Sequence, residues 1–166
     1  DGLDLVVIGH SGVGGGIVID GKVVLGASGA AGEIGHMVIN KEEPERCGCG
    51  KTGCVEQYCS ATGIVRLARR YLSATTVPSP LRDYNMLTCK DIFDAAKAGD
   101  KVALEIMDEY YEYLGEFLGS LCSVIDPEVV VLGGGVSKAG EMLLTGVEPY
   151  FHKYVFHAAS NVKFAL

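Results

Sequence analysis

The chain has 166 residues, of which 48% are hydrophobic and 21% are charged, and its formal net charge at pH 7 is −7. This length lies within the range of a single domain, and the composition is typical of a globular protein. The negative charge argues against nucleic acid as a partner of this domain, because phosphate binding needs clustered Lys and Arg. No uninterrupted apolar run approaches the roughly 18 residues needed to cross a bilayer, so we expect no membrane partner and a cytoplasmic location.

The first third of the chain is predicted to form strands and loops. Short apolar runs predict strands at residues 5–8, 17–19 and 23–25. Gly12–Gly16 is expected to be a loop between the first two strands, and Asp20-Gly21 predicts a hairpin turn because both positions tolerate positive φ. Residues 26–55 have little helical periodicity and are expected to form loops.

Helical periodicity increases after residue 55. A helix is predicted at 55–72, with Arg66, Arg69 and Arg70 on its solvated face, and a second begins at Thr88 with Asp91 in capping-box position. The firmest prediction is a helix over 101–125, where apolar residues recur at spacings of three and four. Gly115 and Gly119 in this helix are expected to allow close approach of another element.

The last part of the chain predicts a strand at 128–132 that is covered on both faces. It is followed by a Gly-rich turn, helices at 137–144 and 148–157, and a strand at 162–164. Strands that alternate with helices in this way indicate an α/β layered fold.

The most informative pattern is His36 followed by Cys47, Cys49 and Cys54. One imidazole and three thiolates at this spacing can form a closed tetrahedral Zn²⁺ site, and soft thiolates select zinc over Mg²⁺ or Ca²⁺. Four protein ligands leave no open position, so the predicted site is structural. The alternative is a loop of unrelated thiols. The remaining cysteines, Cys59, Cys89 and Cys122, are predicted to be reduced and buried.

Two Gly-rich segments are candidate nucleotide-binding elements. Ser11, Gly12 and Gly14 lie after the first strand, where backbone N–H groups could converge on a phosphate, although a simple tight turn is an equal alternative. The segment lacks the Gly-Lys-Ser/Thr ending of a Walker loop. The second segment contains Gly133, Gly134 and Ser137 between a strand and a helix. Its alternative is a connection that merely needs positive φ.

The Cys/His pattern and its flanks resemble the signature of the ROK family of repressors, open reading frames and sugar kinases. The residues that carry the resemblance are Glu33-Ile34-Gly35-His36 and Cys47-Gly48-Cys49-Gly50-Lys51-Thr52-Gly53-Cys54-Val55-Glu56. The continuation through residue 63 is most similar to the bacterial glucokinases of the family. The resemblance implies a ribonuclease-H-like domain of the actin/hexokinase ATPase superfamily with a zinc-binding loop.

The resemblance also implies roles for individual residues. Glu33, His36 and Glu56 would bind the sugar, because an ionised carboxylate accepts hydrogen bonds from adjacent hydroxyls. His36 would use its second ring nitrogen for zinc, which would clamp the two glutamate-bearing loops. Ser11, Gly12 and Gly14 would form the second phosphate-binding segment, where His10 replaces an expected glycine, and Gly133, Gly134 and Ser137 would form the adenosine segment.

The implied function is that of an ATP-dependent hexose kinase, most similar to glucokinase, which transfers the γ-phosphoryl group of Mg·ATP to the sugar 6-hydroxyl. Residues 1–166 would be the C-terminal sugar- and nucleotide-binding domain of a two-domain protein. No residue here is assigned as catalytic, because the family's catalytic Asp and first phosphate loop would lie upstream, and we expect this piece alone to be inactive. The chain opens on Asp1 rather than Met.

Several alternatives remain open from the sequence. A sugar-responsive transcriptional repressor of the same family would keep the zinc site, and a kinase for another hexose or an N-acetylhexosamine would keep the nucleotide segments as well. A small zinc-stabilised binding domain would leave both Gly-rich segments unexplained. A homodimer is expected, with Tyr110, Tyr111 and Tyr113 either at its interface or in the core. The sequence leaves open the hexose and the phosphoryl donor.

Overall fold

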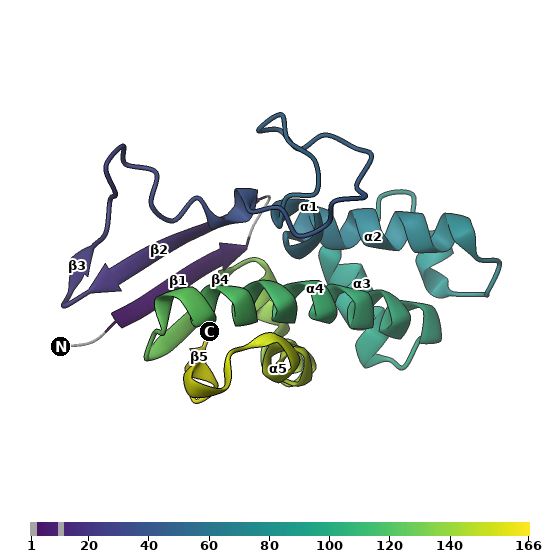
Figure 1. Ribbon diagram of the computed structural model, residues 1–166. Helices are drawn as coiled ribbons and strands as arrows, with labels where there is room; N and C mark the ends of the chain where they lie inside the picture. The colour runs from purple at the N-terminus through teal and green to yellow at the C-terminus, as the bar shows by residue number, and fades with distance from the viewer. Residues whose placement is uncertain (1–2, 10–11) are drawn as a thin grey trace.

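A mixed five-stranded sheet forms one end of the molecule (Figure 1). The computed structural model describes the backbone of residues 3–9 and the whole of residues 12–166. The strand order is β3-β2-β1-β4-β5, and β1 pairs antiparallel with β2 and parallel with β4, which pairs parallel with β5. The strands are β1 (Leu3–Gly9), β2 (Val13–Ile19), β3 (Lys22–Val23), β4 (Val129–Gly134) and β5 (Lys163–Ala165). The α/β prediction is confirmed.

The glycines that follow β1 lie in a strand rather than in the predicted loop. Gly14, Gly15 and Gly16 belong to β2 and pair with β1. Glycine at position 15 leaves room for Ile34, because a Cβ there would lie 2.3 Å from Cδ1 of Ile34 and that side chain would have to move. His10 and Ser11, to which the phosphate-loop prediction also refers, lie outside the described residues. The predicted hairpin turn is confirmed, since Asp20 and Gly21 have φ values of 49° and 72°.

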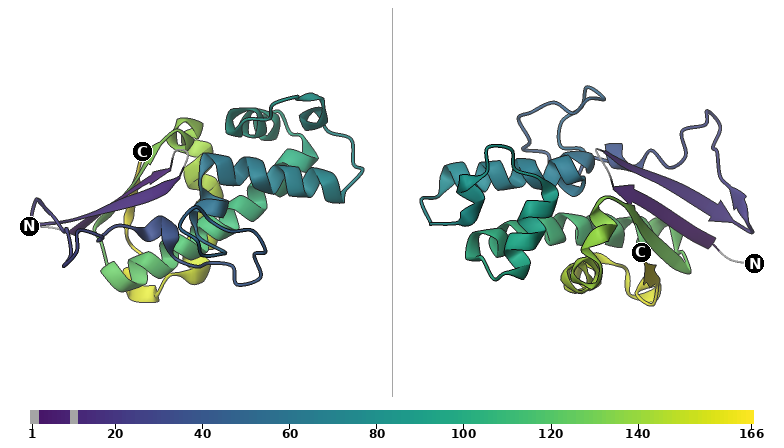
Figure 2. Two further views of the ribbon diagram at one scale, coloured as in Figure 1. Left: turned by 90° about the horizontal axis from the view of Figure 1, so that it is seen from above. Right: turned by 180° about the vertical axis from the view of Figure 1, so that it is seen from behind.

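Five α-helices follow the sheet's first three strands in the sequence. They are α1 (Glu56–Cys59), α2 (Ala61–Ala74), α3 (Cys89–Lys97), α4 (Lys101–Ile125) and α5 (Glu141–Tyr154). The bounds of α4 are those predicted, and the Thr88–Asp91 capping box at the start of α3 is confirmed. Helix α4 runs from the sheet to α2 and α3, which lie at the opposite end of the molecule in both views of Figure 2.

The predicted helix at 55–72 is broken at Ser60. This residue is extended, with φ −82° and ψ 166°, and its hydroxyl accepts a hydrogen bond from the backbone N–H of Gly63 at 2.9 Å. Ser60 therefore ends α1 and caps α2, as serine commonly does at a helix start. The break leaves Glu56 in the first turn of the short helix α1, next to the loop that precedes it.

Helices α4 and α5 pack closely through the two glycines of α4. A Cβ on Gly115 would lie 2.4 Å from Cβ of Tyr150, and one on Gly119 would lie 2.8 Å from the backbone N of Val155, which confirms the predicted close approach. The prediction of two helices at 137–144 and 148–157 is wrong, because α5 continues through Pro149. Burial of its apolar face, Leu143, Val147 and Phe151, offsets the backbone hydrogen bond that proline cannot make.

Only one face of β4 is fully covered, so the prediction of two covered faces is wrong. Val130 and Leu132 are buried. Val129 and Val131, which alternate with them along the strand, are half-buried. The covered face belongs to a core that includes α4, where Tyr110 and Tyr111 are also buried. These two tyrosines are therefore core residues rather than members of a surface patch. Cys59 and Cys122 are buried as predicted, and Cys89 is half-buried.

Residues 75–88 form a connection that is fixed by burial and by hydrogen bonds. The 3₁₀ helix η2 (Pro80–Asp83) places Leu81 in the core with 2% of its surface exposed. The guanidinium of Arg82 donates hydrogen bonds to three backbone carbonyls of the preceding chain, those of Leu72, Thr75 and Val77. Among residues 3–9 and 12–166, no helix combines the length and the apolar character that crossing a membrane would require.

Candidate metal centre and adjoining site

The predicted metal ligands are His36, the last residue of the 3₁₀ helix η1 (Ile34–His36), and three cysteines on the loop that leaves η1 and returns to α1. Figure 1 shows this loop above α1. We call residues 37–54 the metal loop. Its two ends are held together by hydrogen bonds from the backbone N–H of Val55 to the carbonyl of Met37 (2.9 Å) and from that of Ile39 to the carbonyl of Gly53 (2.8 Å). Only glycine fits position 53, since φ is 74° and a Cβ would lie 1.7 Å from the Asn40 carbonyl oxygen.

The loop brings all four predicted ligands together. One ligand atom from each of His36, Cys47, Cys49 and Cys54 lies within 4.8 Å of the others. The Sγ atoms of Cys49 and Cys54 are 3.6 Å apart, and Sγ of Cys47 is 3.7 Å from Nδ1 of His36. Around a tetrahedral Zn²⁺ with Zn–S bonds of about 2.3 Å, neighbouring ligand atoms are about 3.8 Å apart. The spacing and the donor set therefore fit a tetrahedral zinc ion.

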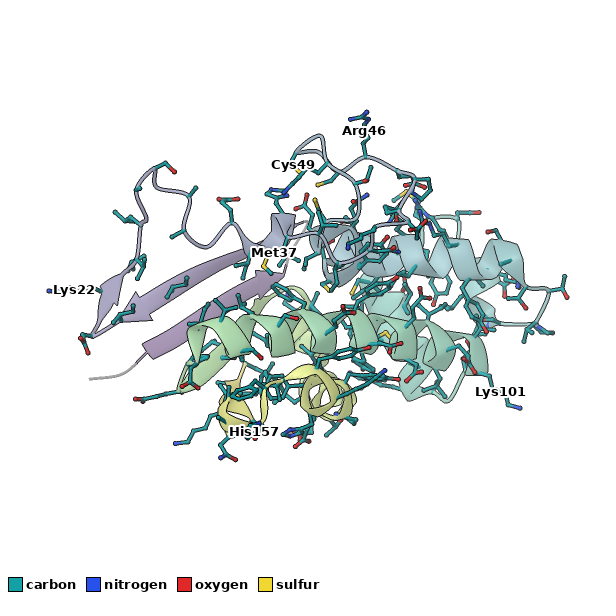
Figure 3. All side chains as sticks on the ribbon, in the orientation of Figure 1. Lys22, Met37, Arg46, Cys49, Lys101 and His157 are labelled. Carbon is teal, nitrogen blue, oxygen red and sulfur yellow. The ribbon has the colours of Figure 1, made fainter. Side chains whose placement is uncertain are left out.

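The thiols differ in their environments. Burial raises the pKa of Cys47 to about 12 and also raises that of Cys54, whereas the backbone N–H of Lys51 lowers the pKa of the exposed Cys49. Three thiolates close together in a partly buried position repel one another, and a bound divalent cation neutralises them. Cys49 lies on the outer part of the metal loop near Arg46, while Met37 lies at its base (Figure 3).

The three predicted sugar-binding residues converge beside this cluster. Nδ1 of His36 faces Cys47 and lies 3.8 Å from Oε1 of Glu56, while Nε2 lies 3.9 Å from Oε2 of Glu33. The two ring nitrogens thus face different groups, as the zinc-and-sugar role requires. Oε1 of Glu56 also accepts a hydrogen bond from the Cys47 thiol at 3.0 Å. Glu33, with 69% of its side chain exposed, leaves the site open to solvent on that side.

The first Gly-rich segment reaches the same site from β2. A Cβ on Gly12 would lie 2.7 Å from Oε2 of Glu56, so this glycine lies directly against the carboxylate. Gly14 is exposed in β2, with nothing within 4 Å of the position of a Cβ. Gly12 therefore adjoins Glu56, and Gly14 lies two residues further along, with an open surface. Their contact with a phosphate stays a prediction.

The second Gly-rich segment borders a separate pocket of about 490 Å³ between α3 and the turn after β4. Its lining includes Phe93 of α3, Gly135 in the turn and the lysines Lys90, Lys97 and Lys138. The predicted residues lie close by but do not line this pocket: Gly133 faces a small internal cavity, and Gly134 ends β4 with φ 84°. The hydroxyl of Ser137 donates to the Gly134 carbonyl at 2.8 Å.

A buried carboxylate within the metal loop, that of Glu43, was not predicted from the sequence. The side chain of Glu43 has no exposed surface and accepts hydrogen bonds from the guanidinium of Arg70 at 2.7 and 2.9 Å. It also pairs with Arg66 and accepts a hydrogen bond from the Tyr58 hydroxyl. The interpretation of the arginines as a solvated face is therefore wrong for Arg66 and Arg70. The available signal was two arginines four apart on one helix and the acidic residues of the loop.

The ion pairs keep Glu43 ionised in spite of its burial. Burial alone would raise its pKa, but hydrogen bonds from Arg70, Arg66 and Tyr58 outweigh that effect and hold the pKa far below 4.5. A lowered carboxyl pKa contributes stability that is fully present above the unfolded-state pKa and is lost as the pH falls below it.

We therefore expect Glu43→Gln to reduce the free energy of unfolding most above pH 4.5, and the difference from the wild type to narrow at lower pH. Urea denaturation of the metal-free proteins on both sides of this pH measures the difference. If the difference in unfolding free energy between the wild type and Glu43→Gln were the same above and below pH 4.5, the assigned ionisation of Glu43 would be contradicted.

Comparisons with known proteins place the chain in a family. The ROK family model matches residues 4–166. A glucokinase of Halalkalibacterium halodurans is 44% identical over 153 residues, which cover 90% of this chain and 46% of that protein. The chain belongs to the ROK family, as its sequence motifs predicted. It spans less than half the length of this relative.

Solved structures agree with the fold. A ROK family glucokinase from Streptomyces griseus, in complex with glucose and AMPPNP, superposes with a TM-score of 0.87 and 31% identity over 98% of this chain and 55% of that one. A ROK family transcriptional regulator, a homologue of the E. coli MLC protein, gives a TM-score of 0.85 at 28% identity over 99% of this chain and 41% of that one. The chain thus has the α/β fold of the ROK sugar kinases within the actin/hexokinase ATPase superfamily.

Proposed function

We propose that this chain is the C-terminal sugar- and nucleotide-binding domain of an ATP-dependent glucokinase. The observation that carries the proposal is the convergence of Glu33, His36 and Glu56 beside a Cys₃His cluster. The glucokinases among its relatives support the choice of a kinase and of glucose. Because the chain spans only part of these relatives, the activity is proposed for the whole protein.

The two glutamates and the histidine suit recognition of a sugar. Ionised carboxylates accept hydrogen bonds from neighbouring hydroxyls, and such charge-assisted bonds are strong and directional. Nε2 of His36 lies on the side of Glu33 and is available to the sugar, while Nδ1 faces the thiols. A zinc ion held by His36, Cys47, Cys49 and Cys54 would supply a fixed cross-link between η1 and the metal loop, and would set the tautomer of His36.

The remaining pocket and the first Gly-rich segment are assigned to the nucleotide. The pocket between α3 and the β4 turn has a mixed apolar and charged lining, in which Asp94 pairs with Lys90, and we place the adenosine part of ATP there. Gly12 and Gly14, near Glu56, are assigned to the phosphates. The Mg²⁺ that accompanies ATP neutralises charge on the transferred phosphoryl group. The catalytic base is expected outside this chain, so the chain alone should be inactive.

The proposal is tested with the full-length protein and ATP across a panel of hexoses and N-acetylhexosamines. We expect rapid turnover with glucose and, for Glu56→Gln, a 10- to 100-fold loss of kcat/KM, since a lost charged hydrogen bond costs about 1.5–3 kcal/mol. Glu42→Gln, an exposed neighbour in the metal loop, should behave as the wild type. Turnover with an N-acetylhexosamine instead of glucose would reassign the substrate.

A ROK transcriptional repressor is the second candidate, favoured by the structural likeness to the ROK family regulator. A repressor would bind the sugar through the same carboxylates without turning over ATP. Sugar binding by calorimetry, combined with no phosphorylation of any sugar in the panel, would support this function over the kinase and make DNA binding by the full-length protein the next measurement.

A further inference from the structure

We propose that Glu43 is a positioning residue for the metal centre, which orders the metal loop before the ion arrives. The inference goes beyond the metal site proposed above and rests on it. The carboxylate of Glu43 is bound by Arg66, Arg70, Tyr58 and the backbone of Glu45, and it acts on the ligands through the backbone and side chains that carry them.

Glu43 fastens the first half of the metal loop to α1 and α2. It lies four residues before the first loop cysteine, Cys47, and its carboxylate is held from several directions by Arg66 and Arg70 of α2 and by Tyr58 of α1. The backbone N–H of Glu45 donates to the same carboxylate at 2.8 Å, which fixes the turn of the chain just before the ligands. A fully buried charge held by two guanidinium groups has little freedom to move.

A neighbouring set of contacts holds the beginning of the loop. The side-chain amide of Asn40 donates to the hydroxyls of Tyr58 at 3.0 Å and of Tyr113 at 3.2 Å. The two tyrosine rings stack with their centroids 4.2 Å apart, so Asn40 and Glu43 are attached to the same rigid pair of rings. The loop is thereby anchored to α4 as well as to α1.

Gln57 connects Glu45, near the middle of the metal loop, to the ligand Cys54 at the end of the loop. Its amide nitrogen donates to the carbonyl of Glu45 at 3.0 Å, and its amide oxygen accepts the backbone N–H of Cys54 at 3.0 Å. Arg66 joins the same group by donating to Oε2 of Glu45 at 2.9 Å and to the carbonyl of Gln57 at 3.2 Å. The chain of contacts runs from Glu43 through Glu45 and Gln57 to Cys54, and it uses no metal–ligand bond.

Because these contacts do not depend on the ion, they should hold the ligands in place in the metal-free protein. A loop that is already ordered loses less conformational entropy when it binds, and this raises affinity. Loss of groups that orient metal ligands typically weakens metal binding 10- to 100-fold. Removing the Glu43 anchor should therefore weaken Zn²⁺ binding although every ligand is retained.

The test measures Zn²⁺ affinity of the purified full-length protein by competition with a chromophoric chelator. We expect Glu43→Gln to bind Zn²⁺ about 10- to 100-fold more weakly than the wild type. Glu42→Gln, which removes a carboxylate of the same loop that is exposed, should keep wild-type affinity. The absorption spectrum of bound Co²⁺ should stay that of a tetrahedral Cys₃His site in Glu43→Gln, which shows that the ligands are unchanged.

A second variant keeps the test decisive if Glu43→Gln fails to fold with two arginines left unpaired. Gln57→Met removes the link between Glu45 and Cys54 without changing a buried charge, and about 10-fold weaker Zn²⁺ binding is expected. Hydrogen exchange at residues 37–54 of the metal-free protein should be slow in the wild type and faster in either variant.

The possible outcomes distinguish a failure of the proposed metal site from a failure of the positioning role of Glu43. A wild type that binds no Zn²⁺ would overturn the metal site itself. A wild type that binds Zn²⁺, with unchanged affinity in Gln57→Met and in any folded Glu43→Gln protein, would overturn the positioning role. A lower melting temperature with unchanged Zn²⁺ affinity would likewise assign Glu43 to general stability alone.

Discussion

Replacing Cys54 with serine is expected to abolish tight Zn²⁺ binding by the protein and, with it, the stabilisation that Zn²⁺ provides. Cys54 is fully buried, and its Sγ lies 3.6 Å from that of Cys49, so the substitution removes a donor from the centre of the cluster. A hydroxyl does not supply the thiolate that zinc prefers, and we expect at least a 100-fold loss of affinity, or about 2.7 kcal/mol. Zinc stoichiometry and thermal unfolding with and without Zn²⁺ measure both effects.

Cys89→Ser is the matched control for this variant. Cys89 is half-buried as the first residue of α3 and lies outside the cluster, so the protein should still bind one Zn²⁺ per chain and still be stabilised by it. If Cys54→Ser kept the wild-type zinc content and the same shift in melting temperature, the four-ligand assignment would be wrong. In the kinase assay, Cys54→Ser should also weaken sugar binding because His36 loses its fixed orientation.

Gly35→Ala is expected to lower the free energy of unfolding and to weaken binding at both the proposed metal centre and the adjoining proposed sugar site. An added Cβ would lie 1.8 Å from the carbonyl oxygen of Val13 and 2.7 Å from its carbonyl carbon. These are backbone atoms of β2, so the strand or η1 must shift, at a cost of about 3 kcal/mol or more. Gly35 is preceded by Ile34, which packs on β2, and followed by His36, which belongs to the metal cluster. A shift of η1 away from β2 therefore displaces His36.

Urea denaturation of Gly35→Ala and Gly16→Ala provides the comparison. Gly16 lies in the same strand as Val13, but a Cβ there would meet nothing within 4 Å, so that variant should stay within about 1 kcal/mol of the wild type. Zn²⁺ affinity should fall in Gly35→Ala alone. Equal stability of the two variants would show that η1 can move away from β2 without loss, contrary to the packing described.

Features governed by neighbours in the sequence were predicted well. The bounds of α4, the Asp20-Gly21 turn and the Thr88 capping box follow from periodicity, positive-φ tolerance and hydrogen bonds between residues three apart. Where local rules failed, tertiary packing outweighed them. Two helices were predicted at 137–144 and 148–157, with Pro149 in the first turn of the second, yet the buried face of α5 on α4 keeps one helix continuous through Pro149.

The glycines of β2 are a second case in which local composition predicted the wrong structure. Gly14–Gly16 have a composition typical of a loop, but seven consecutive residue pairs with β1 make the segment a strand. The preference for glycine comes from Ile34 of η1, which is 19 residues away from Gly15 in the sequence and packs directly on it. A contact of this kind has no local signature, so composition was interpreted as flexibility.

The sequence by itself determined the family, the α/β class and the four residues that cluster as candidate metal ligands, because donor type and spacing within one short segment restrict the possible site. It also named Glu33, His36 and Glu56. Only the tertiary structure decided that the two ring nitrogens of His36 face different groups and that Gly12 adjoins Glu56. The same is true of Glu43 and its arginines. These arrangements depend on β2, η1, α1 and α2 meeting in space, and packing between distant segments is set by the whole core rather than by any local pattern.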